Sequence, residues 1–267
     1  MIDGMFVFDA HAHTYEPRET IWGVIGQTYE EWLARMDRNG IDMSLIMSNP
    51  ELTPEAQRAA NDYVAEAISR HPDRFLGLMW VTPMWGDRAL EEMRHGKATG
   101  LCGIKLYPHG QGNFPLDTPL LDPLMDLAEE LDWVVVAHTD IDSKVCNPHL
   151  GIRLAERHPD VTFIFAHMGM NSDVTHFVPA YVQDQPNIYL DTSDTPNLPQ
   201  FVYKTPMAVI PDRMLFGSDA PTLSPEVELK KVEVAEELYG LTKDEKRKIL
   251  GGNAARLFHI DLSSRSG

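Results

Sequence analysis

The chain has 267 residues, 43% of them hydrophobic, which is enough for one large domain with a substantial core. Its formal net charge of −17, from 23 basic and 40 acidic side chains, disfavours nucleic acids and anionic membranes as partners. The two cysteines are too few for a disulfide framework, and residues 1–6 show neither a basic segment nor a long apolar run. We therefore expect a cytoplasmic protein whose partner is a small molecule.

Eight short apolar segments recur along the chain, and polar stretches of helical period separate them. The segments are Met5–Phe8, Met43–Met47, Phe75–Val81, Cys102–Lys105, Val134–Ala137, Thr162–Ala166, Ile188–Leu190 and Met214–Phe216. Several are apolar throughout rather than alternating, which is typical of parallel strands that helices cover. We interpret all eight as strands of a parallel sheet.

Helices are predicted between these strands from capping residues and turn signals. Thr28–Asn39 begins at a threonine and ends before Gly40, and Thr53–Arg70 has proline at its first helical position. The other predicted helices are Asp87–Ala98, Leu120–Leu131, Leu150–Arg157, Val174–Asp184, Gln200–Val209, Pro225–Leu238 and Thr242–Leu250.

Eight strands that alternate with helices predict an α/β fold, a (β/α)8 TIM barrel of parallel strands. Residues 1–267 are expected to form it as a single domain, since the composition shows no linker. The alternative is an open doubly wound sheet. That fold favours a glycine-rich phosphate loop after the first strand, where this chain has Asp9-Ala10-His11.

Histidine and aspartate residues follow the predicted strands at the end where barrel enzymes place their active sites. His11 and His13 follow the first strand, and their spacing lets both side chains project to the same side of an extended segment. His138 and His167 directly follow the fifth and sixth strands, and Asp219 follows the eighth. Neutral imidazoles with a carboxylate suit a divalent metal ion. The pattern therefore predicts a metal site at the carboxyl ends of the strands.

Six segments occur in a definite order along nearly the whole chain. They are Asp9–His13, Gly103–Pro108, Ala137–His138, Phe165–Gly169, Gly217–Asp219 and Gly252–Phe258. With these segments the sequence resembles the amidohydrolase superfamily. More narrowly, it resembles the amidohydrolase-related branch that includes aminocarboxymuconate-semialdehyde decarboxylase and pyrone-dicarboxylate lactonase.

The resemblance implies that His11, His13, His138 and Asp219 bind one metal ion. Zinc is the expected ion, and manganese, iron and nickel fit the same ligands. One ion is expected rather than two. Dimers are common among the relatives, so a homodimer is the oligomeric state that the resemblance suggests.

Asp219 and His167 are the catalytic residues that the resemblance implies. Asp219 would take a proton from a metal-activated water molecule, and His167 would orient that water or polarise the substrate. Lys105 has three open interpretations. It is a carboxylated bridge to a second metal ion, with His138 and His167 as further ligands, or a cation that contacts the substrate, or a lysine paired with a buried carboxylate.

Several other residues have weaker assignments. Tyr107 and His109 follow the fourth strand and are candidate substrate contacts. Asp191 and Asp194 follow the seventh strand and are candidate hydrogen-bond partners of the ligands. Four loops would select the substrate: Tyr15–Gln27, Tyr107–Pro119, Thr139–Pro148 and Ser193–Pro199.

Three functional hypotheses follow. The first is a metal-dependent hydrolase that acts on a small carbonyl-containing substrate, amide-like or lactone-like, which can carry a carboxylate. The second is a metal-dependent, non-oxidative decarboxylase of an aromatic or muconate-like acid. Some decarboxylases of the branch have glutamate at the first motif position, so His11 favours hydrolysis. The third is a non-catalytic metal-binding barrel, which predicts a closed coordination sphere and no adjoining pocket.

Overall fold

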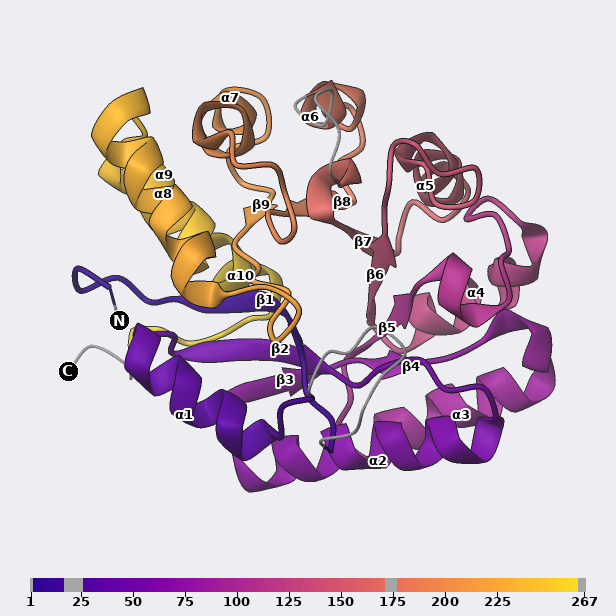
Figure 1. The fold of residues 1–267 in the computed structure, drawn as a ribbon. Helices are drawn as coiled ribbons and strands as arrows, with labels where there is room; N and C mark the ends of the chain where they lie inside the picture. Colours follow the sequence, from indigo (N-terminus) through magenta and orange to yellow (C-terminus); the bar gives the residue numbers. More distant parts are fainter. Residues whose placement is uncertain (1, 17–25, 171–176, 264–267) are drawn as a thin grey trace.

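Nine short strands surround the centre of the molecule in a computed structural model that describes residues 2–16, 26–170 and 177–263 (Figure 1). The strands are β1 (Phe8–His13), β2 (Met43–Met47), β3 (Phe75–Gly77), β4 (Met79–Trp80), β5 (Gly103–Leu106), β6 (Val134–His138), β7 (Thr162–Ala166), β8 (Ile188–Asp191) and β9 (Met214–Leu215). All neighbours pair in parallel, in the orders β1-β2-β3 and β4-β5-β6-β7-β8-β9.

Backbone hydrogen bonds join these two runs of strands into one closed barrel. β3 and β4 are interrupted only at Leu78, whose N–H donates to the carbonyl of Ile46 on β2 at 2.9 Å. On the other side, the N–H of Ala10 on β1 donates to the carbonyl of Phe216, directly after β9, at 2.8 Å. With β3 and β4 counted as one strand, the fold is the (β/α)8 barrel that the sequence predicts.

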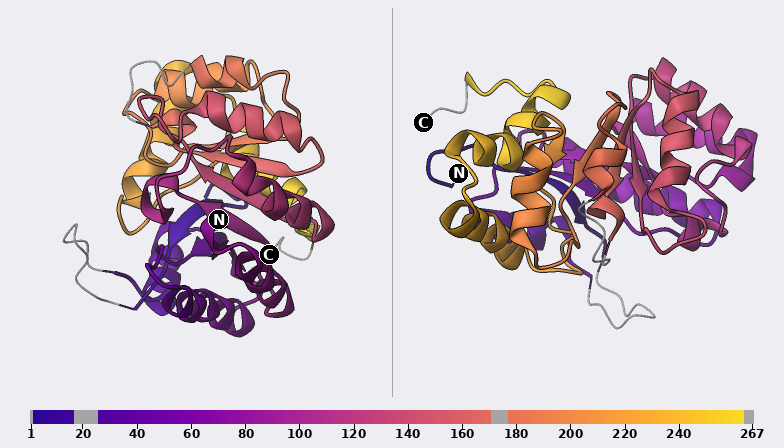
Figure 2. Two further views of the ribbon diagram at one scale, coloured as in Figure 1. Left: turned by 90° about the vertical axis from the view of Figure 1, so that its right-hand side faces the viewer. Right: turned by 90° about the horizontal axis from the view of Figure 1, so that it is seen from above.

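Helices lie on the outside of the barrel (Figure 1, Figure 2), and among the described residues seven α-helices come between successive strands and three follow the last strand. They are α1 (Tyr29–Asn39), α2 (Pro54–Arg70), α3 (Asp87–Ala98), α4 (Asp122–Glu130), α5 (Pro148–Arg157), α6 (Val178–Tyr181), α7 (Thr205–Met207), α8 (Pro225–Tyr239), α9 (Lys243–Arg247) and α10 (Asn253–Leu257). Short turns supplement them: η1 (Pro83–Trp85), η2 (Pro108–Gln111), η3 (Pro119–Leu121), η4 (His167–Gly169), η6 (Gln200–Lys204) and η7 (Lys248–Gly252).

Capping residues start the first helices where the sequence predicts. The side chain of Thr28 accepts from the N–H of Glu31 at 3.1 Å, and the Glu31 carboxylate accepts from the N–H of Thr28 at 2.9 Å. This capping box satisfies two N–H groups that the first turn of α1 leaves free. Gly40 ends α1 with φ 67°, a left-handed conformation that glycine adopts at no steric cost. Thr53 caps α2 by accepting from the N–H of Ala56 at 3.2 Å.

The first strand lies later in the chain than predicted. β1 spans Phe8–His13 instead of Met5–Phe8, so His11 and His13 lie within the strand rather than beyond it. The prediction followed a continuous apolar run, whereas β1 also buries polar side chains. Both Asp9 and His11 are fully buried. Buried polar residues in a strand therefore displaced the predicted boundary.

The other strands match their predicted ranges to within one residue, apart from the break at Leu78. Among the helices, the predicted Gln200–Val209 is divided into the π-helical turn η6 and the short α7. The predicted Thr242–Leu250 continues through η7 into α10, a helix that the sequence analysis missed. Of the predicted Val174–Asp184, residues 174–176 lie outside the described residues, and α6 begins at Val178.

The continuous apolar run of β6 serves two layers of packing. Val134 and Val136 belong to the cluster inside the barrel, while Val135 and Ala137 belong to the cluster between the barrel and its helices. Successive side chains of a strand point to opposite faces, and both faces of β6 are buried here. The burial on both sides accounts for the lack of polar alternation in the sequence.

Apolar side chains close the amino-terminal end of the barrel. The ring of Phe258 stacks on that of Phe8 with centroids 5.4 Å apart, and Ala254 of α10 joins the interior cluster. The carboxyl ends of the strands are consequently where the polar side chains collect. Within residues 2–16, 26–170 and 177–263, no helix has the length and apolar content that crossing a bilayer requires.

Candidate metal centre

The closure of the barrel brings His11, His13 and Asp219 together, although more than two hundred residues separate them in the sequence. The N–H of Asp219 donates to the carbonyl of His11 at 2.8 Å, which places the loop after β9 against β1. Asp219 Oδ1 then lies 3.5 Å from His11 Nε2 and 3.3 Å from His13 Nε2. One atom from each side chain lies within 4.8 Å of the other two, so the three can reach a common ion.

Hydrogen bonds fix which nitrogen of each imidazole faces this space. His11 Nδ1 lies 2.9 Å from Asp191 Oδ2, and His13 Nδ1 lies 2.9 Å from the carbonyl oxygen of Ser48. Since both partners are acceptors, each Nδ1 carries the proton and donates. Each Nε2 then carries a lone pair and lies close to Asp219. Histidine ligands of metal ions are held in this way by a partner of the other nitrogen.

Asp191, at the end of β8, connects two of the histidines. Besides His11, its carboxylate accepts from the backbone N–H of His167 at 3.1 Å and from the hydroxyl of Ser193. His167 Nδ1 in turn lies 3.2 Å from the carbonyl of Ser193 and 2.9 Å from its hydroxyl. The prediction that Asp191 is a hydrogen-bond partner of the site is confirmed.

His138 takes a more distant place than the other predicted ligands. It ends β6, and its ring centroid lies 4.8 Å from that of His167 and 4.6 Å from that of Tyr107. In the part of the chain that the structure describes, His138 belongs to none of the groups whose ligand atoms all lie within 4.8 Å of one another. The structure therefore brings His11, His13, His167 and Asp219 into contact and leaves His138 beside His167. Its role as a ligand stays a prediction.

Lys105 enters the site from β5 with only 2% of its surface exposed. Its Nζ lies 2.9 Å from His11 Nε2, the atom that is predicted to bind metal. Among the described residues, no carboxylate oxygen lies within 4.0 Å of this ammonium, which weakens the interpretation of Lys105 as half of a buried ion pair. Burial lowers the pKa of Lys105 to about 8, although Asp191 and Asp219 favour the charged form.

Burial keeps His11, His138 and His167 neutral near pH 7. It lowers the pKa of His167 to about 4, and it also lowers the pKa values of His11 and, further, His138. Burial by itself would raise the pKa of Asp219, but the adjacent His13 and His11 lower it below its usual value. Neutral imidazoles beside an ionised carboxylate are the protonation states that metal binding requires.

The two candidate substrate contacts differ in position. Tyr107 is half-buried and packs edge-on against His138, so it lies at the site. His109 is exposed and bridges two loops, with Nε2 3.0 Å from the hydroxyl of Ser143 and Nδ1 3.2 Å from Asn113 Oδ1. Of the four predicted substrate-selecting loops, the first lies largely outside the described residues, at 17–25.

Three supporting residues were missed by the sequence analysis. Ser48 and Ser193 hold the Nδ1 atoms of His13 and His167, as described above. Asp9 is fully buried, and its Oδ1 accepts from the N–H groups of His11 and Ser218, both at 3.0 Å. Burial raises the pKa of Asp9 to about 7. The sequence offers one signal for each of these three residues: it lies within a strand, or shortly after one, at this end of the barrel.

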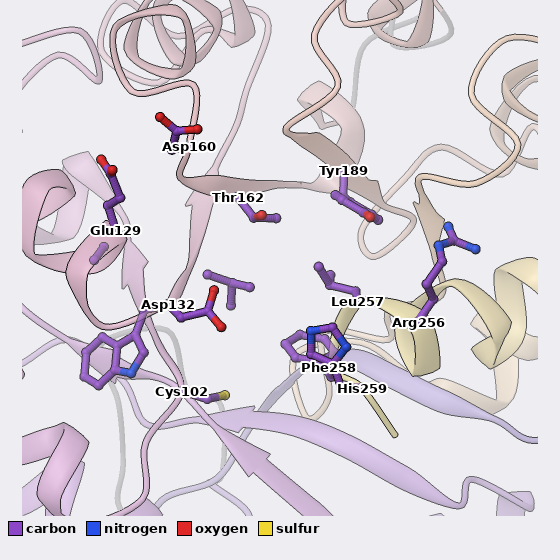
Figure 3. A pocket seen from close by; sticks show the side chains of 13 residues that line it. Cys102, Glu129, Asp132, Asp160, Thr162, Tyr189, Arg256, Leu257, Phe258 and His259 are labelled. Carbon is purple, nitrogen blue, oxygen red and sulfur yellow. The ribbon is translucent and has the colours of Figure 1, made fainter. Parts of the chain in front are cut away.

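Two cavities adjoin the barrel at opposite ends. One of about 360 Å³ is lined by Cys102, Thr162, Tyr189 and Phe258 among others, and its lining includes the first residues of β6 and β7 (Figure 3). It therefore lies at the amino-terminal end, away from His11, His13, His138 and His167. The other, of about 670 Å³, is lined in part by Ser48, whose carbonyl holds His13. Its lining contains none of the proposed ligands, so this cavity does not test the hypothesis of a non-catalytic barrel.

Comparison with known proteins identifies relatives of this chain. A family model described as amidohydrolase matches residues 8–260. The 4-sulfomuconolactone hydrolase of Hydrogenophaga intermedia is 27% identical over 262 residues, which cover 86% of this chain and 78% of the relative. The 2-amino-3-carboxymuconate-6-semialdehyde decarboxylase of Dictyostelium discoideum is 24% identical over 148 residues, 52% of this chain and 38% of the relative.

A solved structure shares the fold. A dihydroxybenzoic acid decarboxylase from Polaromonas, with bound manganese and an inhibitor, superposes with a TM-score of 0.75 at 18% sequence identity. The match covers 97% of this chain and 98% of that protein. At this identity the likeness concerns the barrel architecture alone.

Proposed function

We propose that this chain, which belongs to the amidohydrolase family, is a metal-dependent hydrolase of a small carbonyl-containing substrate. The substrate is lactone-like or amide-like and can carry a carboxylate. The reaction class follows the 4-sulfomuconolactone hydrolase relative, whose match covers 86% of this chain. Residues 1–267 would act as one catalytic domain, because the site combines residues from the first and last strands of the barrel.

The observation that carries this proposal is the convergence of His11 and His13 on Asp219. Both Nε2 atoms approach the same carboxylate oxygen, at 3.5 Å and 3.3 Å, while both Nδ1 atoms are occupied elsewhere. Two imidazole nitrogens and one carboxylate oxygen fit a divalent ion, and we propose zinc. Manganese, iron and nickel suit the same donors. His138, the remaining predicted ligand, would complete the set.

The residues around this position suit hydrolysis by water. A divalent ion held there would lower the pKa of a water molecule and polarise a substrate carbonyl. Asp219 would accept the proton of the attacking water, since its low pKa keeps it ionised. His167 donates through Nδ1 to the carbonyl of Ser193, so its Nε2 lone pair would accept a hydrogen bond from that water. This arrangement favours water orientation over carbonyl polarisation as the role of His167.

The alternative function is non-oxidative decarboxylation of an aromatic or muconate-like acid. Lys105 is compatible with it, because a buried cation beside the site would pair with the carboxylate of such an acid, as it would with that of a carboxylated lactone. The decarboxylase relative supports it, although that match covers only 52% of this chain. His11 favours hydrolysis, because some decarboxylases of the branch have glutamate at this first position of the motif.

The products of the reaction distinguish the two functions. Protein stripped of metal and reloaded with Zn²⁺ is assayed with a panel of carboxylated lactones and a panel of hydroxybenzoic acids. Ring opening is followed by proton release, and CO2 by a coupled assay. We expect ring opening without CO2, lost in His11→Ala and retained in Asp142→Asn, a control at an exposed position. Release of CO2 would show that the protein is a lyase rather than a hydrolase.

A further inference from the structure

A second group of possible ligands lies next to the first. His167, Asp194 and Asp219 each offer one atom, and these atoms lie within 4.8 Å of one another. Asp219 belongs to both groups, so the two positions are neighbours that share this carboxylate. Of the second group, His167 and Asp219 are 3% and 8% exposed, and Asp194 is partly exposed.

The backbone on both sides of Asp194 is anchored, but its carboxylate is not. The hydroxyl of Ser193 donates to Asp191, and the carbonyl of Thr195 accepts from Lys231 Nζ at 2.9 Å. Asp194 itself has φ 48°, a left-handed conformation that aspartate tolerates better than most residues. Within residues 2–16, 26–170 and 177–263, no group donates a hydrogen bond to the Asp194 carboxylate. Anchored neighbours thus present an unpaired carboxylate to the site.

The imidazole of His167 has one nitrogen that no hydrogen bond among the described residues occupies. Its Nδ1 is taken by Ser193, and among the described residues its Nε2 has no hydrogen-bond partner. The group of His11, His167 and Asp191 also satisfies the distance criterion, but there His11 Nδ1 already donates to Asp191 at 2.9 Å. Hydrogen bonds therefore explain that group without an ion, whereas they do not explain the approach of Asp194 to His167 and Asp219.

Electrostatics also favours a cation at this place. Asp194 and Asp219 are like charges in a largely buried space, where repulsion is only weakly screened. Lys231 lies nearby, but Glu228 pairs with it at 2.7 Å and 2.9 Å, which neutralises its charge. Lys105 is engaged with His11 Nε2. A divalent cation between the two carboxylates would remove the repulsion and use the free His167 nitrogen.

We propose that His167, Asp194 and Asp219 hold a second divalent cation beside the catalytic one, with Asp219 as the shared ligand. This inference rests on the proposed metal site at His11, His13 and Asp219 and extends it. With the second cation bound, the Nε2 lone pair of His167 would hold that cation, and the cation would orient the attacking water in place of the imidazole. One imidazole and two carboxylates suit Mn²⁺ and Zn²⁺. The second ion is bound without a carboxylated lysine, because Asp194 supplies the extra negative charge that such a bridge would bring.

Counting bound ions tests the proposal. Metal-free protein is titrated with Mn²⁺, and free Mn²⁺ is measured by its electron paramagnetic resonance signal. We expect two ions per wild-type chain and one per Asp194→Asn chain. Lys105→Met and the surface control Asp142→Asn are expected to keep two. The low-temperature spectrum of the wild type should show two spin-coupled ions, and Asp194→Asn should show an isolated one.

Other outcomes would overturn the proposal. If the wild type binds one ion, or if Asp194→Asn still binds two, the assignment of a second ion to His167, Asp194 and Asp219 is wrong. Loss of the second ion in Lys105→Met alone would assign it to a lysine bridge instead. Circular dichroism checks folding, and Asp194→Ser replaces Asp194→Asn if the latter does not fold. A wild type that binds one ion and still opens lactones leaves the proposed function intact, whereas a wild type that binds none removes both.

Discussion

Replacement of Asp191 by asparagine tests whether the hydrogen bond to His11 Nδ1 controls metal binding. The Asp191 carboxylate accepts from His11 through Oδ2, and from the backbone of His167 and the hydroxyl of Ser193 through Oδ1. In Asp191→Asn the amide oxygen can keep the bonds at Oδ1, so the amide nitrogen must face His11 Nδ1. Two donors then meet, unless His11 moves its proton to Nε2. Either result weakens His11 as a ligand.

The expected loss of metal affinity follows from the single hydrogen bond that Asp191→Asn removes. A hydrogen bond to a charged group contributes about 1.5–3 kcal/mol. At about 1.4 kcal/mol for each factor of ten, Asp191→Asn should weaken Zn²⁺ binding roughly 10- to 150-fold. Binding is measured by competition with a chromophoric chelator, with Asp142→Asn as the matched control for loss of charge. An unchanged dissociation constant in a folded Asp191→Asn protein would refute the role of Asp191 in orienting His11.

Further predictions concern turnover, acid stability and helix capping. Asp219→Asn, fully loaded with metal, should lower kcat by at least about 100-fold, because the general base is lost; an unchanged kcat would contradict that role. The folded pKa of His167 is about 4 and its unfolded value about 6.5, so the unfolded chain binds more protons between these values and stability falls on acidification. Between pH 7 and pH 5, the free energy of unfolding of the metal-free protein, measured with urea, should fall by about 2 kcal/mol because of this group. In His167→Gln the free energy of unfolding should depend less on pH, and an equal pH dependence in the two proteins would contradict the prediction. Thr28→Ala should lower the free energy of unfolding by about 1 kcal/mol without changing kcat, with Thr28→Ser retaining most of it, and a Thr28→Ala protein as stable as the wild type would show the cap to be unimportant.

The sequence predicts the barrel well because its strands and helices carry local signals. Apolar runs, caps and helix stops all lie within a few residues of the elements they define, and the resulting alternation permits few architectures. The same alternation placed His11, His167 and Asp219 at one end of the barrel. Their neighbourhood follows from strand order, so it could be predicted before any distance was known.

The orientation of these side chains could not be predicted in the same way. The partner of His13 Nδ1 lies 35 residues away, at Ser48, and the partner of His11 Nδ1 lies 180 residues away, at Asp191. No local pattern encodes such pairs, since they depend on the register between strands. Asp194 is a similar case, because a left-handed backbone conformation and two anchored neighbours decide where its carboxylate points.

The proposed metal centre lies at the seam where the first and last strands of the barrel meet. Asp9 crosses this seam, because its Oδ1 accepts from the N–H of His11 on β1 and from that of Ser218 after β9, both at 3.0 Å. Before the barrel closes, Asp219 has no reason to be near His11 or His13, so the ligand set exists only in the closed fold. An ion that binds only this state stabilises it by RT ln(1 + [M]/Kd), about 2.7 kcal/mol at a hundred times Kd. Closure of the barrel and assembly of the site are consequently one equilibrium, and a change that opens the seam weakens metal binding even where every ligand is retained.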